Sequence, residues 1–203
     1  YYSDEARAVF RLSSESHWDV PIRVGEQVLH LLASDPTPPV FDGLEDRNGR
    51  RNHDEIRFWA DYLSADRSGS IRDDAGVTGG LSCEADFVIA GDLNADPFDG
   101  ESVGHAVRML LEHPRVAGDF TPLSDGAIEA ANRQRRVNEN HQGDPVFDTA
   151  DFSDSGPGNL RADYVLPSRS MTILDGRVFW PVSSDPESEW ARASDHHLVW
   201  IDL

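Results

Sequence analysis

A short acidic and amide-rich motif follows one apolar run of this chain. Residues 91–97 read Gly-Asp-Leu-Asn-Ala-Asp-Pro and come directly after the apolar residues 87–90. An apolar run rich in β-formers and stopped by glycine predicts a buried strand, which places the motif at the strand's C-terminal end. If the strand continues into the motif, Asp92 and Asn94 point to one face. Their carboxylate and amide groups would suit a metal-bound water or a phosphoryl oxygen.

Two structural alternatives compete with an active site at this motif. Gly, Asp, Asn and Pro dominate turns, so the motif taken alone is equally compatible with a simple turn. Asp92, Asn94 and Asp96 also match the first three ligand positions of a helix-flanked calcium loop. That loop requires Gly where Pro97 stands and Glu where Val103 stands. The sequence therefore excludes the calcium loop and leaves the turn and the active site open.

Two later positions carry groups that could act with this motif. Asp163 lies inside the β-rich segment 161–168, where a buried carboxylate is costly unless it is paired. Asp195 and His196 precede the last predicted strand, and imidazole is the side chain best matched to proton transfer near neutral pH. His197 follows directly, so one imidazole can face inward and the other outward. A turn-capping Asp163 and a structural histidine are the alternatives.

Taken together, the acids and one histidine favour a hard divalent cation. Carboxylates with imidazole and no cysteine suit Mg²⁺ or Mn²⁺ better than structural zinc, with Ca²⁺ as a further option. Such a cation would neutralise charge on a phosphoester and polarise its oxygens. Asp163 could also hold His196 in one tautomer, as a carboxylate does in a catalytic triad.

The elements that must position these groups alternate between strands and helices. Strands are predicted at 6–13, 28–34, 87–90, 162–166, 177–180 and 198–203, and helices at 52–63, 103–111 and 124–136. Asn52 with Glu55 three residues later predicts a capping box for the first helix. Residues 65–80 and 137–160 are polar and glycine-containing, and a loop as long as the second is usually functional or mobile. This alternation predicts an α/β layered domain.

Composition narrows the choice of partners. The 203 residues suit a single domain, 1–203, and one cysteine excludes an internal disulfide. Acidic residues outnumber basic ones 37 to 18, every basic residue is arginine, and the net charge is −19. Such a surface repels nucleic-acid backbones and favours a small phosphoester over duplex nucleic acid. No run approaches the ~20 apolar residues of a membrane helix, and no signal peptide is recognisable. The sequence does not predict an oligomeric state.

The ordered motifs 91–97, 161–168 and 194–196 resemble the endonuclease/exonuclease/phosphatase superfamily. The resemblance runs from Ala6 to the end of the chain. The segments 16–21, 36–43 and 52–59 are similar to a bacterial branch of that superfamily. It implies a DNase I-like layered β-sandwich flanked by helices, within the α/β (α+β) class. It also implies a divalent-metal-dependent phosphoesterase, hydrolysing a phosphodiester or phosphomonoester by direct attack of an activated water.

The same resemblance implies roles for individual residues. Asp92 and Asn94 would orient the attacking water and hold the phosphate, and Asp195 would approach the metal. His196 would transfer a proton or stabilise the pentavalent phosphorus, with Asp163 as its partner.

The sequence departs from the family pattern in two ways. The family's first strands, which carry an Asn and a metal-binding Glu, would precede every segment seen here. The chain is therefore expected to be the C-terminal portion of a domain, from a longer and secreted precursor. In addition, Asp35 stands where a phosphate-contacting His is expected, and His30, His53 and Arg57 are further candidate substrate contacts. A catalytically impaired fragment or a non-catalytic phosphate- or metal-binding domain is therefore the alternative function.

Overall fold

A four-stranded mixed sheet is the centre of the molecule. The structure is a computed structural model that describes residues 2–203. The sheet order is β1-β2-β3-β6; β2 and β3 run parallel, and the two outer pairs are antiparallel. Its strands are β1 (His17–Val24), β2 (Gln27–Ser34), β3 (Asp86–Asp92) and β6 (Asp163–Pro167). Two smaller antiparallel sheets pair β4 (Ala150–Asp151) with β5 (Asn159–Leu160) and β7 (Asp175–Phe179) with β8 (Leu198–Asp202).

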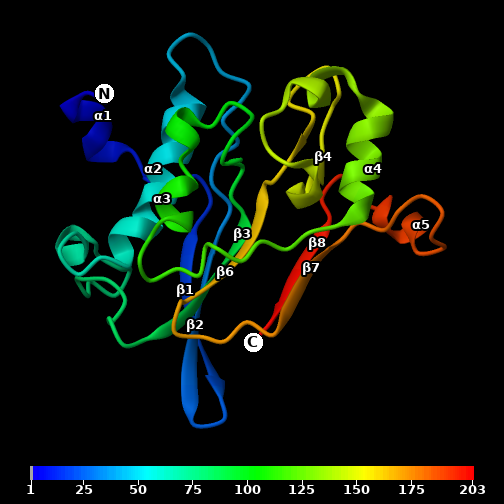
Figure 1. The fold of residues 1–203 in the computed structure, drawn as a ribbon. Helices are drawn as coiled ribbons and strands as arrows, with labels where there is room; N and C mark the ends of the chain where they lie inside the picture. The colour runs from blue at the N-terminus through cyan, green and yellow to red at the C-terminus, as the bar shows by residue number, and fades with distance from the viewer. Residues whose placement is uncertain (1) are drawn as a thin grey trace.

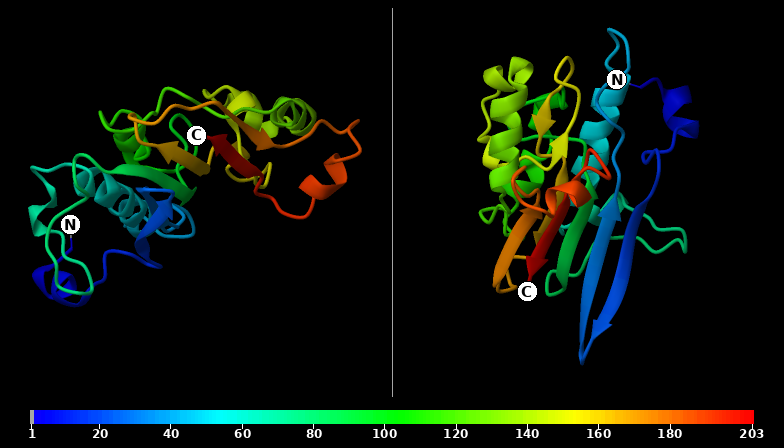
Figure 2. Two further views of the ribbon diagram at one scale, coloured as in Figure 1. Left: turned by 90° about the horizontal axis from the view of Figure 1, so that it is seen from below. Right: turned by 90° about the vertical axis from the view of Figure 1, so that its right-hand side faces the viewer.

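Helices lie beside the main sheet and beside the β7–β8 pair (Figure 1). The α-helices are α1 (Asp4–Val9), α2 (Arg47–Tyr62), α3 (Arg108–Leu111), α4 (Asp125–Gln134) and α5 (Ser188–Ala191). Short 3-10 helices are η1 (Ser68–Ser70), η2 (Val103–His105), η3 (Arg136–Asn140) and η4 (Pro145–Phe147). The α/β class predicted from the sequence is confirmed, and Figure 2 shows the elements in layers.

The larger core fills the space between α2, α3 and the main sheet. Ile56 and Trp59 on one face of α2 are buried, as their helical spacing predicts, and pack with Phe87 and Ile89 of β3. A second core lies under α4, where alanines of the helix contact Val178 and Trp180. The larger core includes side chains of both β3 and β6, among them Tyr164 and Leu166, so it supports the strand pair from one side.

Most predicted strands are present, but the expected strand over 6–13 is wrong. Residues 4–9 form α1, whose first backbone N–H groups are capped by Ser3, with Asp4 and Glu5 in the first turn. These start signals favour a helix and outweigh a three-residue alternation of apolar side chains. Conversely, β1 lies outside the predicted strands and contains Pro21. As β1 lies at the edge of the sheet, a missing backbone donor is tolerated there.

The first long helix begins earlier than the predicted capping box. α2 starts at Arg47, so Asn52 lies inside the helix and is fully buried rather than at its N-cap. The Asp42 carboxylate accepts the backbone N–H groups of Asn48 and Gly49 from outside the helix. A distant carboxylate therefore satisfies the first turn, which local sequence could not reveal.

The remaining helix predictions hold in part. α4 agrees with the predicted helix, and the Ser124 hydroxyl caps it by accepting the N–H of Ala127. The predicted helix over 103–111 is two short pieces, η2 and α3, and Gly104 and His105 within the first piece have positive φ values of 61° and 50°, which do not continue an α-helix. The loop 137–160 contains η3, η4 and the strands β4 and β5.

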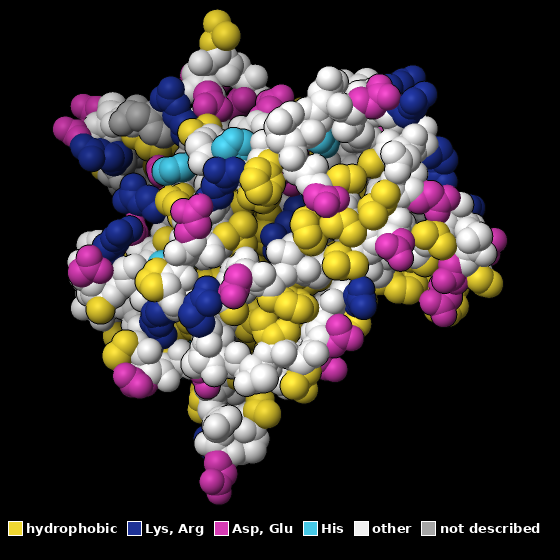
Figure 3. All heavy atoms as spheres, in the orientation of Figure 1, with side chains coloured by type: hydrophobic (Ala, Val, Ile, Leu, Met, Phe, Trp, Pro, Cys, Tyr) yellow, Lys and Arg dark blue, Asp and Glu magenta, His cyan; other side chains and the backbone are white. Residues whose placement is uncertain are grey.

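On the face shown in Figure 3, arginine and acidic side chains are interspersed around the rim, and apolar side chains gather in the middle. Within residues 2–203, no helix has the length and apolar character needed to cross a membrane.

Candidate active site

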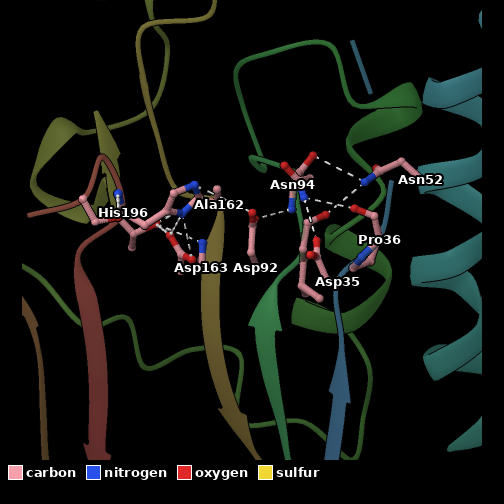
Figure 4. Close-up of polar contacts among 11 residues, drawn as sticks. Asp35, Pro36, Asn52, Asp92, Asn94, Ala162, Asp163 and His196 are labelled. Carbon is pink, nitrogen blue, oxygen red and sulfur yellow. Dashed lines mark hydrogen bonds and ion pairs between the residues drawn. The ribbon is translucent and has the colours of Figure 1, made fainter. Parts of the chain in front are cut away.

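The facing ends of β3 and β6 bring two predicted acids together. Asp92 and Asp163 are direct partners in the antiparallel β3–β6 ladder, so their backbones lie opposite each other. His196 is brought to the same place by a β-bridge to Ala150, next to the strand pair β4–β5. Three residues separated by up to 104 positions in the sequence therefore meet at one edge of the sheet (Figure 4).

His196 lies between the two carboxylates. Its Nδ1 donates to the Asp163 carboxylate, 2.9 Å from Oδ2 and 3.1 Å from Oδ1. Its Nε2 is 3.9 Å from Oδ2 of Asp92. The ring of Phe152 packs edge-on against the imidazole at 5.2 Å. Because Nδ1 is engaged by Asp163, Nε2 is the ring atom left to act on a ligand.

Burial and mutual charge shift the pKa values of all three groups. Burial raises the pKa of Asp92 to about 6, helped by the Asp163 charge and opposed by the hydrogen bond from the Asn94 N–H. Burial also raises the pKa of Asp163, against the hydrogen bonds from His196 and Thr149. Burial lowers the pKa of His196, but the hydrogen bond and charge of Asp163 outweigh it and the pKa is raised. Titratable groups with perturbed pKa values that meet at one site are typical of proton-transfer sites.

Thr149 is a support for Asp163 that the sequence analysis missed. Its hydroxyl donates to Oδ2 of Asp163 at 2.9 Å and accepts the backbone N–H groups of Ala162 and Asp163 at 3.0 and 2.9 Å. The Thr149 side chain is 1% exposed, and its backbone carbonyl accepts the N–H of His197 at 2.8 Å. Thr149 thus connects the segment of the acid with that of the imidazole. No local sequence pattern marks this residue.

Asn94 lies on the other side of Asp92. The strand β3 stops at Asp92, and Asn94 adopts a left-handed backbone conformation with φ of 50°. The Asn94 N–H donates to Oδ1 of Asp92 at 2.8 Å, so the motif is a turn as well as part of the site. The Asn94 amide donates to Oδ1 of Asp35 at 3.2 Å and to the Pro36 carbonyl at 3.0 Å. Asp92 therefore faces His196, whereas Asn94 faces Asp35 (Figure 4).

Asn52 holds this turn from behind. Its side-chain amide donates to the Leu93 carbonyl at 3.0 Å and lies 3.4 Å from the Asn94 carbonyl. Its Oδ1 accepts the hydroxyl of Ser102 at 3.2 Å. The buried amide in the middle of α2 therefore satisfies the backbone of the turn after β3, which explains a polar side chain in the core.

Gly91 lets the turn approach its neighbour strand. A Cβ at Gly91 would lie 2.0 Å from the Ser34 carbonyl oxygen at the end of β2. Ser34 is in turn held by the indole N–H of Trp59, which donates to its hydroxyl at 2.8 Å. Only a residue without Cβ fits here, so glycine directly before Asp92 is a packing requirement.

A cavity of about 710 Å³ opens beside these residues. Asp35, Asp92, Asn94 and His196 line it, together with apolar groups of the loop 37–41 and of residues 152–160. None of its lining residues is an arginine, and the chain has no lysine. The loop 137–160 therefore contributes to the cavity, as expected, whereas Arg133, which precedes it, lines a different hollow.

The chemistry of the central group fits a divalent cation. Among residues 2–203, Asp92, Asp163 and His196 are the group of potential ligands whose donor atoms all lie within 4.8 Å of one another. Two carboxylates and one imidazole suit Mg²⁺ or Mn²⁺. The group thus supplies the donor types that the sequence predicts for the cation.

Asp195 does not belong to this group of three. It is exposed, it lines a separate hollow near α4 and α5, and its carbonyl accepts the N–H of Asp151 at 2.7 Å. Its charge still reaches the site, since it raises the pKa of both Asp163 and His196. The neighbouring His197 faces inward, where it stacks on Trp180 at 3.8 Å and its burial lowers its pKa to about 4.

Three candidate substrate contacts lie away from the cavity. His30 is bound to Asp19, with Nδ1 2.6 Å from Oδ1, near the middle of β2. His53 contacts its neighbour Asp54 on α2, and Arg57 donates to Asp61 one turn along the same helix. None of the three lines the cavity, so neither His30 nor His53 replaces Asp35 at the site. The register of β2 and the orientation of α2 determine where these three side chains lie, and neither can be predicted from neighbouring residues alone.

Comparison with known proteins agrees with this arrangement. The family model described as "Endonuclease/Exonuclease/phosphatase family" matches residues 11–196. This range includes both strands and all three residues of the central group. No curated protein matches the chain.

Proposed function

Because the chain belongs to the endonuclease/exonuclease/phosphatase family, we propose that it is a divalent-metal-dependent phosphoesterase. The reaction would be hydrolysis of a phosphodiester or phosphomonoester by direct attack of water. The observation that supports it best is His196, held by Asp163 and facing Asp92 beside a cavity of about 710 Å³. A family of hydrolases and a site with paired acids and a positioned imidazole point to the same chemistry.

The proposal gives each residue of the site a role that agrees with its position. Asp92 and Asn94 would orient the water and hold the phosphate from the end of β3. Nε2 of His196 would hydrogen-bond a phosphoryl oxygen or move a proton, while Asp163 keeps the ring in place and stabilises its charged form. The new bond forms between the water oxygen and phosphorus, the phosphorus–alcohol bond breaks, and the alcohol leaves with a proton. A bound Mg²⁺ or Mn²⁺ would neutralise charge on the phosphoryl oxygens.

The cavity favours a small phosphoester over duplex nucleic acid. Backbone phosphates of nucleic acids are normally bound by several basic side chains. The cavity is lined by acidic and apolar residues without an arginine, and the whole chain carries a net charge of −19. We therefore expect a substrate with one phosphate and an uncharged or apolar alcohol, which avoids charge repulsion.

One observation favours a second function, a phosphate- or metal-binding domain without turnover. Asp35 lies beside Asn94, where a phosphate-contacting cation would assist the reaction. Burial and the charges of Glu15 and Glu55 raise the pKa of Asp35, but a carboxylate there opposes an anionic substrate. The loss of one stabilising contact can cost several kcal/mol, about 3–4 in comparable oxyanion sites.

The deciding experiment compares hydrolysis with metal binding in the same variants. Release of p-nitrophenol from bis- and mono-p-nitrophenyl phosphate is measured with Mg²⁺, Mn²⁺ or Ca²⁺ and after chelation. We expect metal-dependent turnover that falls about 10²–10⁴-fold in His196→Ala, because a positioned proton-transfer group contributes this much. His53→Ala, outside the cavity, is the matched control and should retain full activity.

Calorimetry with Mn²⁺ separates the two functions. Metal binding that is weakened by Asp92→Asn but comes with no turnover would support the non-catalytic domain. Turnover that is unchanged in both Asp92→Asn and His196→Ala would refute the assignment of the active site.

A further inference from the structure

A second cavity, of about 480 Å³, shares only Asp96 with the candidate active site. The Asp96 carboxylate is fully engaged, since it accepts the backbone N–H groups of Phe98, Asp99 and Arg161 at 2.7, 2.8 and 2.9 Å. Beyond it the cavity is lined by both charge signs and by aromatic rings: Arg108, Arg161, Asp144, Asp148, Phe98 and Phe147. Neither the family match nor the phosphoesterase proposal gives this cavity a role.

Arg161 is a buried guanidinium that forms no ion pair within residues 2–203, although the charge of Asp96 acts on it. The residue is 7% exposed, and its guanidinium lies over the ring of Tyr164 at 4.6 Å. Its one hydrogen bond within residues 2–203 is from Nη1 to the Thr121 hydroxyl, at 3.5 Å. Burial lowers the pKa of Arg161, but a guanidinium stays protonated in proteins. Buried charges are normally paired, so this cation faces the cavity with most of its donors unused.

Asp148 is the complementary group. It is 8% exposed, and nothing in the described part of the chain donates a hydrogen bond to its carboxyl or forms an ion pair with it. Burial, with the charges of Asp96, Asp99 and Asp144, raises its pKa to about 8. Asp148 and Arg161 line the same cavity but do not contact each other. Each could pair with the other by charge, yet both remain unpaired within the described residues.

A metal ion does not explain these unpaired groups. Within residues 2–203, the acids of this cavity do not form a group whose oxygens lie close enough to share one cation. A simple anion would leave Asp148 without a partner, and a simple cation would leave Arg161 without one. A ligand that carries both charges satisfies both side chains.

We propose that this cavity binds a small zwitterionic amino-carboxylate with a short apolar body. Its carboxylate accepts hydrogen bonds from the Arg161 guanidinium, a pairing whose planar geometry arginine suits. Its amino group donates to Asp148, and the apolar body lies against Phe98 and Phe147. A cavity of this size accommodates such a molecule, since small-molecule sites range from about 300 to 1,000 Å³.

The proposal is tested by titrating the purified chain with L-phenylalanine and with L-leucine. Binding is measured by protein-observed NMR and by calorimetry. We expect at least one of the two to bind with a Kd of about 1 mM or below. The resonances that shift should belong to residues around 96–98 and 144–161. For a bound L-phenylalanine, 3-phenylpropanoate lacks the amino group and 2-phenylethylamine lacks the carboxylate, so each should bind at least tenfold more weakly. 4-Methylpentanoate and isopentylamine serve likewise for L-leucine.

Variants assign the two charges separately. Asp148→Asn should weaken zwitterion binding at least tenfold but leave binding of the carboxylate-only analogue unchanged, and Arg161→Gln should weaken both. Arg133→Gln, an exposed arginine at another hollow, should change neither. Absence of binding by both amino acids to the unmodified chain would overturn the proposal, as would equal affinity for the single-charge analogues. The wild-type titrations and Asp148→Asn decide the outcome even if Arg161→Gln does not fold.

Discussion

The hydroxyl of Thr149 is bonded to both the side chain and the backbone of Asp163. It donates to Oδ2 at 2.9 Å and accepts the Asp163 N–H at 2.9 Å. The carboxylate that holds His196 is therefore supported by Thr149, which directly precedes β4. Such support determines how accurately an acid orients an imidazole.

Thr149→Val should impair both stability and turnover. Valine has nearly the same shape but leaves the N–H groups of Ala162 and Asp163 without an acceptor, which costs about 1–3 kcal/mol. Asp163 also loses a donor that lowers its pKa, so the pH dependence of kcat should change. Urea unfolding and pH–rate profiles check this. Thr149→Ser keeps the hydroxyl and should restore the wild-type pH profile; a profile unchanged in Thr149→Val would contradict the positioning role.

Asp35→Asn should strengthen binding of anionic substrates. Asparagine keeps an oxygen that can accept the Asn94 amide but removes a negative charge from the cavity. Removing one charge repulsion at a partly exposed site is worth about 1 kcal/mol, so KM should fall roughly three- to tenfold with little change in kcat. The affinity for inorganic phosphate, measured by calorimetry, should change in the same direction.

Asp66→Asn is the matched control for net charge, because Asp66 is exposed on a loop outside the cavity. An equal fall of KM in both variants would show that overall charge, and not the position of Asp35, sets the affinity.

Gly91→Ala should destabilise the whole fold. The added Cβ would lie 2.0 Å from the Ser34 carbonyl, so β2 and β3 must move apart where the active-site turn begins. We expect a loss of about 1–3 kcal/mol in the free energy of unfolding, as overpacked sites show, measured by urea denaturation. Gly69→Ala, where a Cβ meets nothing within 4 Å, should stay within about 0.5 kcal/mol of wild type. Equal stability of the two variants would disprove the close approach of the strands.

Asp148→Asn should stabilise the protein at alkaline pH. The folded-state pKa of Asp148 is about 8 against an ordinary value of 3.8, so the folded state binds the proton more tightly. Between these two values the folded state holds more protons than the unfolded state, and stability falls as pH rises. The penalty is absent below pH 3.8 and complete above about pH 8, at about 1.4 kcal/mol per pKa unit.

The variant lacks this titration, so its gain in Tm over wild type should grow from pH 5 to pH 9. A gain that does not depend on pH would mean that Asp148 is ionised in the folded protein throughout this range.

The central strand and the acidic motif 91–97 that follows it could be predicted because their signals are local. The apolar run 87–90 followed by glycine predicts β3, and α4 begins at the predicted Ser124 cap. Predictions that relied on weaker local patterns failed. The alternation over 6–13 gave way to the helix α1, and the apparent capping box at Asn52 lies inside α2 because Asp42 caps the helix from a distance.

The sequence by itself determined which residues are candidates for the chemistry. Asp92, Asn94, Asp163 and His196 could be named from their residue types and their places at the ends of strands, and all four lie at one edge of the sheet. Only the tertiary structure decided how they are held and what surrounds them. Pairing of β3 with β6 places Asp92 opposite Asp163, and the buried Thr149 and Asn52 fix the acid and the turn. Strand register and helix orientation also place His30 and His53 outside the cavity, whereas Asp35 lines it. Residue types and strand ends are properties of a few neighbouring residues, whereas register and long-range hydrogen bonds arise only when distant segments pack together.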